Sequence, residues 1–163
     1  MSDDRYREAR ALNGVARFHE LFQAPVLDAP EIPSADRCAL RIKLLQEELD
    51  ELRESIEDQD IVEVADALAD LQYVLSGAVH EFGLGDRFAR LFAEVQRSNM
   101  SKACATHEEA QRTVDAYRAK DGTEGYIVER DGEFVVYRRG DDKVLKSVNY
   151  SPADLRSILD AED

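Results

Sequence analysis

The feature that most constrains this chain is a pair of acidic clusters, each inside an otherwise apolar run with helical spacing. The first cluster covers residues 47–51 and the second covers residues 63–70. Apolar residues that recur every three or four positions line one face of a helix. The break between the two runs, residues 57–60, is short, which favours an antiparallel pair of helices. We therefore expect a helical hairpin that brings two rows of carboxylates together.

Most of the remaining chain also has helical spacing. The stretch 25–33 contains three prolines and is expected to be an extended connector, with Ser34 or Asp36 capping the helix that follows. The third helix is apolar on more than one side, so we expect it to be central and buried. Spacing and helix signals predict helices over 5–22, 35–58, 61–82, 86–97 and 106–121, and a last turn or two within 152–159.

A small β-element is expected after the fifth helix. Residues 125–130 and 133–138 alternate in polarity around Asp131 and Gly132, a common pair in two-residue hairpin turns. A short third strand is expected over 143–148. The chain therefore combines a helical bundle with a minor β-structure near its C-terminus.

Length and composition fit one globular domain, since 163 residues with 44% hydrophobic content can bury a core. Within it we expect a helical core over 1–104 and an extension over 105–163 that packs on this core. The expected fold class is all-α: an antiparallel helical bundle with a small C-terminal β-hairpin appendage.

The net charge of −14 argues against binding to nucleic acid or to membrane surfaces, because both need a basic face on the protein. Cys38 and Cys104 lack metal-binding spacing and are expected to be free thiols. Residues 1–5 are polar, and no run reaches the length of a membrane span. The expected location is the cytoplasm.

The acidic side chains of each cluster share a helix face. Those of the first helix lie within an arc of about 100° and those of the second within roughly 60°. Residues 59–79 contain no Lys or Arg, so these carboxylates lack a nearby cation. All-oxygen ligation favours Mg²⁺, with Mn²⁺ as a substitute, and solvated helix faces are the alternative. The acids concerned are Glu47, Glu48 and Glu51 on the first helix and Glu63, Asp66 and Asp70 on the second.

Five segments carry a resemblance to a known enzyme superfamily. The chain resembles the all-α nucleoside triphosphate pyrophosphohydrolases, the group that includes MazG, dimeric dUTPases and phosphoribosyl-ATP pyrophosphohydrolase. The resemblance implies hydrolysis of a nucleoside triphosphate between its α- and β-phosphates, assisted by two or more Mg²⁺ ions, in a homodimer. The segments are 18–20, 47–51, 70–73, 97–102 and the tail 143–150.

The resemblance also implies roles for individual residues. Glu48 and Glu51 match metal ligands, and Glu47 matches either a ligand or the base that orients the attacking water, so Glu47 and Glu48 are the catalytic candidates. The ExxD half of the motif fits two registers. One register pairs Glu63 with Asp66, whereas the other makes Asp70 the aspartate and leaves Ala67 in place of the glutamate. We keep Glu63, Asp66 and Asp70 as candidate ligands.

Positions just after the fourth helix resemble those that contact substrate. Asn99 and Lys102 match them, and Arg97 is a further candidate, because a cationic side chain can bind phosphate. The expected activity is nucleotide-pool house-cleaning, with dUTP as one candidate substrate. An alternative enzyme is phosphoribosyl-ATP pyrophosphohydrolase, which the extra C-terminal region disfavours. A non-enzymatic alternative is an acidic helical module that binds a basic protein partner.

Overall fold

The structure is a computed structural model that describes residues 5–161, so the predicted polar start at residues 1–4 lies outside the described residues. It forms two compact units, residues 5–88 and 89–161. The expected division at residue 104 remains a prediction. The described helices and strands confirm the mostly helical fold with one small hairpin: α1 (Ala11–Phe22), α2 (Ala35–Glu57), α3 (Ile61–Glu81), α4 (Phe88–Met100), α5 (His107–Asp121), β1 (Gly125–Arg130), β2 (Glu133–Arg138) and α6 (Leu155–Leu159).

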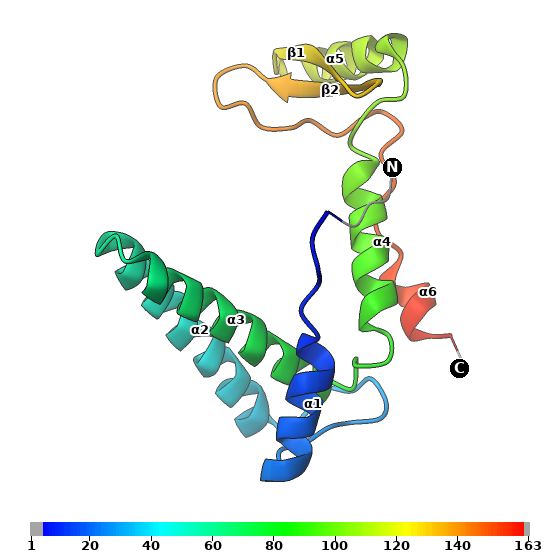
Figure 1. Cartoon of the computed structure of the whole chain (residues 1–163). Coiled ribbons are helices and arrows are strands. Elements are labelled where there is room, and N and C mark those ends of the chain that lie inside the picture. The colour runs from blue at the N-terminus through cyan, green and yellow to red at the C-terminus, as the bar shows by residue number, and fades with distance from the viewer. Residues whose placement is uncertain (1–4, 162–163) are drawn as a thin grey trace. The chain divides into compact units, whose positions relative to one another are not determined.

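In the first unit, α2 and α3 form the expected antiparallel hairpin and lie side by side along their length (Figure 1). Ser34 begins α2 by accepting a hydrogen bond from the backbone N–H of Arg37 at 3.4 Å. The turn between the helices places Gln59 in the left-handed region at φ 57°. Asp60 then begins α3, because its carboxylate accepts the N–H groups of Val62 and Glu63 at 2.9 and 3.3 Å. The predicted limits of both helices hold to within one residue.

A buried ion cluster joins the helices near the end of the hairpin where the chain enters α2 and leaves α3. Glu81 on α3 is only 1% exposed. It accepts hydrogen bonds from Arg37, whose Nε lies 2.9 Å from Oε2, and from Arg41 through Oε1. Such a buried carboxylate is tolerated because both arginines neutralise it. We did not anticipate this cluster, since Glu81 is separated by 40 or more positions from both arginines in the sequence.

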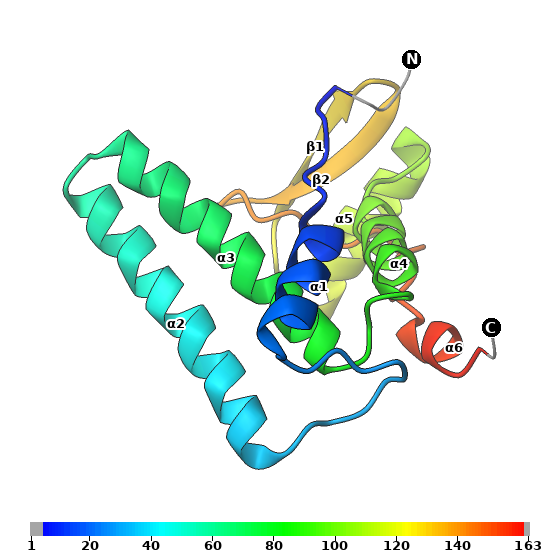
Figure 2. The same cartoon turned by 60° about the horizontal axis from the view of Figure 1, so that its bottom comes forward.

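Helix α1 packs against α3 (Figure 2). It joins the same cluster through the side chain of His19. The Nδ1–H of His19 donates to the carbonyl of Pro25 at 2.8 Å, so its unprotonated Nε2 faces Nη2 of Arg41 at 3.4 Å. The proline connector also bonds to the end of α3, where the N–H of Leu27 donates to the carbonyl of His80 at 3.0 Å. These contacts make α1, the connector, α2 and α3 one packed unit.

Two glycines permit this close packing. A Cβ on Gly77 of α3 would lie 2.5 Å from Nη1 of Arg41 and 3.0 Å from Nε2 of His19. Gly83 ends α3 at φ +65°, and a Cβ there would lie 1.9 Å from the carbonyl oxygen of Ala29. Both positions therefore require glycine, the first for space and the second for space and backbone conformation.

The expectation that α3 is buried all round is wrong for its N-terminal half. Ile61, Val62 and Leu68 are 76%, 70% and 52% exposed. The reason is that α1 packs on the C-terminal half of α3, and α2 alone covers the N-terminal half within this unit. On α2, the exposed apolar residues include Ile42, Leu49 and Ile56, and among its described residues only Arg41 is buried. The hairpin thus presents a wide apolar surface that nothing in its own unit covers.

In the second unit, α5 packs on the β1–β2 hairpin. Gly125 pairs with Arg138 and Arg130 with Glu133, which leaves Asp131 and Gly132 as a two-residue turn with positive φ at both positions. The small core consists of Cys104, Ala110, Val114, Val136 and Leu145. The strand expected over 143–148 is wrong: within it only Val144 forms an isolated bridge, to Tyr137.

Only the second half of that segment leaves the sheet, because α5 binds it. As far as Leu145 the segment still bonds to β2: the N–H of Arg138 donates to the carbonyl of Lys143, and the N–H of Leu145 donates to the carbonyl of Val136, both at 2.8 Å. Thr113 accepts the N–H of Val148 at 3.1 Å, and the phenol of Tyr117 accepts the N–H of Lys146 at 3.3 Å. Glu109, the expected capping-box residue, accepts the N–H of Ala105 at 3.1 Å. Both cysteines are free, as expected. None of the helices within residues 5–161 is long and apolar enough to cross a membrane.

The packing at Gly77 predicts opposite effects for two matched substitutions. Gly77→Ala should lower the free energy of unfolding by about 1–3 kcal/mol, because the new methyl group clashes with Arg41 and His19. Gly14→Ala on α1 should raise it by roughly 0.5–1 kcal/mol, since nothing lies within 4 Å of a Cβ there and alanine is the better helix former. Urea denaturation followed by circular dichroism measures both; equal effects would contradict this packing.

The ion cluster also predicts acid sensitivity in two steps. Burial lowers the pKa of His19 from 6.5, and the positive charge of Arg41 lowers it further, against the Pro25 carbonyl. Burial would raise the pKa of Glu81, but the hydrogen bonds from Arg37 and Arg41 outweigh it and the pKa falls below 4.5. Because the unfolded chain then binds protons more readily, stability should fall first below pH 6.5 and again below pH 4.5.

The first step should be absent in His19→Asn, which retains an N–H donor for the Pro25 carbonyl but does not titrate. The control is His107→Asn, which changes an exposed histidine on α5 in the second unit. Thermal melts at pH 7.5 and 5.5 distinguish the two variants. Two results would refute the assignment to His19: a wild-type melting temperature that is the same at both pH values, or a difference between the two pH values that persists in His19→Asn.

Candidate active site

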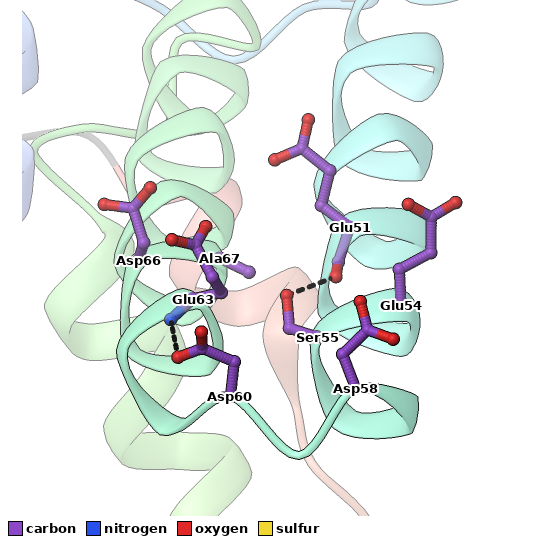
Figure 3. A pocket seen from close by; sticks show the side chains of 8 residues that line it. All are labelled: Glu51, Glu54, Ser55, Asp58, Asp60, Glu63, Asp66 and Ala67. Carbon is purple, nitrogen blue, oxygen red and sulfur yellow. Dashed lines mark hydrogen bonds between the residues drawn. The ribbon is translucent and has the colours of Figure 1, made fainter.

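A hollow of about 440 Å³ lies between α2 and α3 near the turn that joins them (Figure 3). Six of its eight lining residues are acidic, and none of the eight is basic. Figure 3 shows the Glu51 carboxylate directed toward the space between the helices and Glu54 turned away from it. The lining residues are Glu51, Glu54, Ser55, Asp58, Asp60, Glu63, Asp66 and Ala67.

Helical spacing explains how the hollow forms. On α2 the lining positions lie three and four residues after Glu51, and Asp58, which caps the helix, lies seven after it; on α3 they lie three and four residues after Glu63. The hydroxyl of Ser55 donates to the carbonyl of Glu51 at 2.7 Å, so this side chain stays close to its own helix. Ala67 is 3% exposed, and its short side chain leaves the space between the helices open.

Glu48 lies one turn further along α2, away from the connecting turn. Burial raises its pKa, and the negative charges of Glu51, Asp70, Glu47 and Asp66 raise it further, in that order. Two of these four acids belong to α3. The hairpin therefore brings the two acidic stripes close enough for their carboxylates to repel one another, as expected from the sequence.

Asp66 and Glu51 are common to both parts of this acidic region. Each lines the hollow, and each raises the pKa of Glu48. Glu63 belongs to the hollow and Asp70 to the group around Glu48, so the two registers of the ExxD motif describe neighbouring portions of one region. Ala67, the position where a glutamate is expected, lines the hollow one turn beyond Glu63.

Glu47 lies at the outer side of the group. Its carboxylate is 3.4 Å from the ammonium of Lys43, and its side chain is 49% exposed. It still contributes to the raised pKa of Glu48. Its predicted role as base or ligand is untested by this arrangement and stays a prediction.

Within residues 5–161, no three Asp, Glu, His or Cys side chains stand close enough together to hold one metal ion as they are placed. The donor chemistry nevertheless fits a hard cation, since every candidate ligand is a carboxylate oxygen. Segment 47–70 contains 11 acidic residues and one basic residue, Arg53, which pairs with Asp50 at 2.8 Å. A divalent cation would relieve the resulting repulsion, so the residues fit Mg²⁺.

The sequence analysis missed three acids that line the hollow: Glu54, Asp58 and Asp60. The first two continue the helical stripe from Glu51 at steps of three and seven, a signal present in the sequence. Asp60 also caps α3, and that structural role accounts for its position.

The predicted substrate-binding residues belong to the second unit. The ammonium of Lys102 donates to Oδ1 of Asn99 at 2.7 Å, so these two side chains are held together at the end of α4. Arg97 is engaged elsewhere: its guanidinium binds the carboxylate of Glu94 at 2.8 and 2.7 Å and the carbonyl of Pro152 at 3.0 Å. Arg97 thus holds the segment before α6, and its role toward substrate remains a prediction.

Comparison with known proteins places this geometry in context. Residues 15–99, a little more than half of the chain, match the family model described as phosphoribosyl-ATP pyrophosphohydrolase. That range includes both acidic stripes, and α5 and the β-hairpin lie outside it. The chain is also similar to an uncharacterized protein of Acanthamoeba polyphaga mimivirus, at 27% identity over 128 residues. The match covers 63% of this chain, which spans about half the length of that protein (51%).

The repulsion predicts that removing one carboxylate stabilises the metal-free protein. In EDTA, Glu51→Gln should raise the melting temperature, since each like-charge pair costs about 0.2–0.5 kcal/mol. Glu57→Gln, an exposed acid outside the hollow, should change it less. Mg²⁺ should raise the melting temperature of the wild type more than NaCl of the same ionic strength. No stabilisation by Glu51→Gln in EDTA would contradict the account.

Proposed function

Because the chain belongs to the phosphoribosyl-ATP pyrophosphohydrolase family, we propose that it hydrolyses a nucleoside triphosphate to the monophosphate and pyrophosphate in the presence of Mg²⁺. One observation carries the proposal: six acids from the α2–α3 hairpin line one hollow without a basic residue. Beside it, burial raises the pKa of Glu48, and the negative charges of acids from both helices raise it further. Carboxylates without cationic partners repel one another and destabilise the hairpin. A divalent cation would relieve this repulsion and could also bind the phosphates of a substrate.

Glu48, Glu51, Asp66 and Asp70 are the proposed metal ligands, with Glu63 at the edge of the same region. Bound Mg²⁺ supplies positive charge for the phosphates and lowers the pKa of a coordinated water. The chain's own carboxylates set its position, and the packed α2–α3 hairpin fixes the spacing between them. The short turn at 58–60 keeps the two stripes in register.

The proton released from the attacking water needs an acceptor. We assign this role to a carboxylate of the pair Glu47 and Glu48, which accepts the proton as the water oxygen bonds to phosphorus. The bond between the α- and β-phosphates breaks, and pyrophosphate leaves with the electron pair. Glu47 is exposed and forms an ion pair with Lys43, whereas Glu48 interacts with the other acids.

Lys102 and Asn99 are the proposed phosphate contacts. The Lys102 ammonium has three N–H donors and uses one on Asn99, so donors remain for phosphate oxygens. A lysine ammonium is a point charge that suits a phosphate oxygen.

For the substrate we propose a canonical or modified (deoxy)nucleoside triphosphate, with dUTP as one candidate. Phosphoribosyl-ATP is the second candidate, because the matching family model carries that name. The region beyond residue 99, which the family model does not cover, favours the first candidate. A cytoplasmic location also remains a proposal.

We further propose that the protein acts as a homodimer. The support is the apolar surface of the hairpin, where Ile42, Ile56 and Ile61 are 69%, 58% and 76% exposed. Exposed apolar surface on such a scale is typical of a face that a partner covers. A second copy of the chain would bring the same surface to the contact.

A pyrophosphate-release assay over a panel of nucleotides, with Mg²⁺ or EDTA, tests the activity. The wild type should release pyrophosphate from at least one nucleotide with Mg²⁺ alone. Glu51→Gln and Asp70→Asn should each reduce kcat/KM by about 100-fold or more, whereas Glu57→Gln should stay within about twofold, given how much a lost metal ligand costs compared with a surface change. No turnover of any member, together with no effect of Mg²⁺ on melting, would instead favour the acidic interaction module.

A further inference from the structure

The second unit contains a hollow with the opposite charge. It measures about 260 Å³, and lysines are its only charged lining residues. In a chain with 35 acidic and 21 basic residues, a concave surface lined by lysines without an acid is unusual. The lining residues are Ala116, Tyr117, Lys120, Lys146, Ser147, Val148 and Tyr150.

Its two walls are fixed to one another. One wall is the C-terminal half of α5 and the other is segment 146–150, which follows the buried Leu145. The hydroxyl of Ser147 donates to the buried carboxylate of Glu109, and the N–H of Tyr150 donates to the carbonyl of Ser147 at 2.9 Å. Together with the bonds of α5 to Lys146 and Val148, these contacts hold the hollow open at a defined width.

The lysines of the hollow form no ion pair within residues 5–161. An acid that interacts with them is Asp121, whose pKa is lowered first by hydrogen bonds with Thr123 and then by the charge of Lys120. The Lys146 ammonium lies 4.2 Å from the centre of the Tyr150 ring. A hydrogen bond with Ser98 lowers the pKa of Tyr150, and the charges of Lys146 and Lys102 lower it further. The electrostatic potential around the ring of Tyr150 is therefore positive.

Two kinds of surface meet in this hollow. Tyr117, Tyr150 and Val148 supply aromatic and aliphatic walls, and Lys120 and Lys146 supply ammonium donors. A ring that stacks on tyrosine and carries a phosphate satisfies both at once. The volume lies just below the usual range of about 300–1,000 Å³ for small-molecule sites, which suits a ligand no larger than a mononucleotide.

We propose that this hollow is a binding site for a nucleoside monophosphate, with the phosphate on Lys120 and Lys146 and the base against Tyr117 and Tyr150. The site belongs to the second unit, outside the part of the chain that matches the family model. It needs no divalent cation, because lysine ammonium groups carry the phosphate. The proposal does not depend on the hydrolysis proposed for the acidic region.

Binding of AMP and UMP to the full chain in EDTA tests the proposal, because without metal the acidic region has no cation for phosphate. Isothermal titration calorimetry should give saturable binding of at least one nucleotide. Lys120→Met and Lys146→Met, which keep most of the aliphatic stem, should each weaken it by about tenfold or more, the loss expected for a charge-assisted contact. Lys143→Met should stay within about twofold, because Lys143 carries the same charge outside the hollow.

Circular dichroism of each variant checks that the fold is retained, and Tyr150→Leu tests the ring contact separately, with weaker binding expected. Three results would overturn the proposal: no saturable binding of either nucleotide, equal weakening by Lys143→Met, or inorganic phosphate binding as tightly as the nucleotides. The test is distinct from the activity assay, because it uses metal-free protein and measures no turnover.

Discussion

The proposed cation site depends on a repulsion between carboxylates that the fold enforces. The α2–α3 hairpin holds two acidic stripes together, and segment 47–70 has 11 acidic residues against one basic residue. The two stripes cannot move apart without breaking the packing of the two helices. Burial raises the pKa of Glu48, and acids from both helices raise it further, which is the effect of this constraint.

Charge is distributed unequally along the same hairpin. At one end, Arg37 and Arg41 surround the buried Glu81 and join α1 through His19. At the other end, six acids line a hollow that has no basic lining residue. The neutralised end joins α1, α2 and α3 in one packed unit, and the other end keeps its negative charge available for a ligand. Binding sites are best held on such rigid, packed elements.

Local signals in the sequence predicted much of this arrangement. Helical spacing, the cap at Ser34 and the turn at Asp131 and Gly132 act over a few residues, so the helices and the hairpin could be recognised. The convergence of the acidic stripes followed from the short turn at 58–60. The stripe also contained Glu54 and Asp58, which we overlooked because the resemblance ended at Glu51.

Long-range contacts could not be predicted in the same way. Glu81 meets Arg41 across 40 positions, and nothing in its neighbourhood distinguishes it from a solvated acid. The apolar pattern of α3 suggested burial all round, but burial depends on how many neighbours a helix has. Segment 143–148 has the alternation of a strand, yet beyond Leu145 its N–H groups at Lys146 and Val148 donate to the side chains of Tyr117 and Thr113 on α5.

Direct measurement of cation binding tests the central claim, that the acids of both helices share a divalent cation. Asp66 is the critical residue, since it belongs to the hollow and to the group around Glu48. Mn²⁺ titration followed by electron paramagnetic resonance should show saturable binding to the wild type and to Glu57→Gln, and at least about tenfold weaker binding to Asp66→Asn. Equal binding by all three proteins would contradict the account.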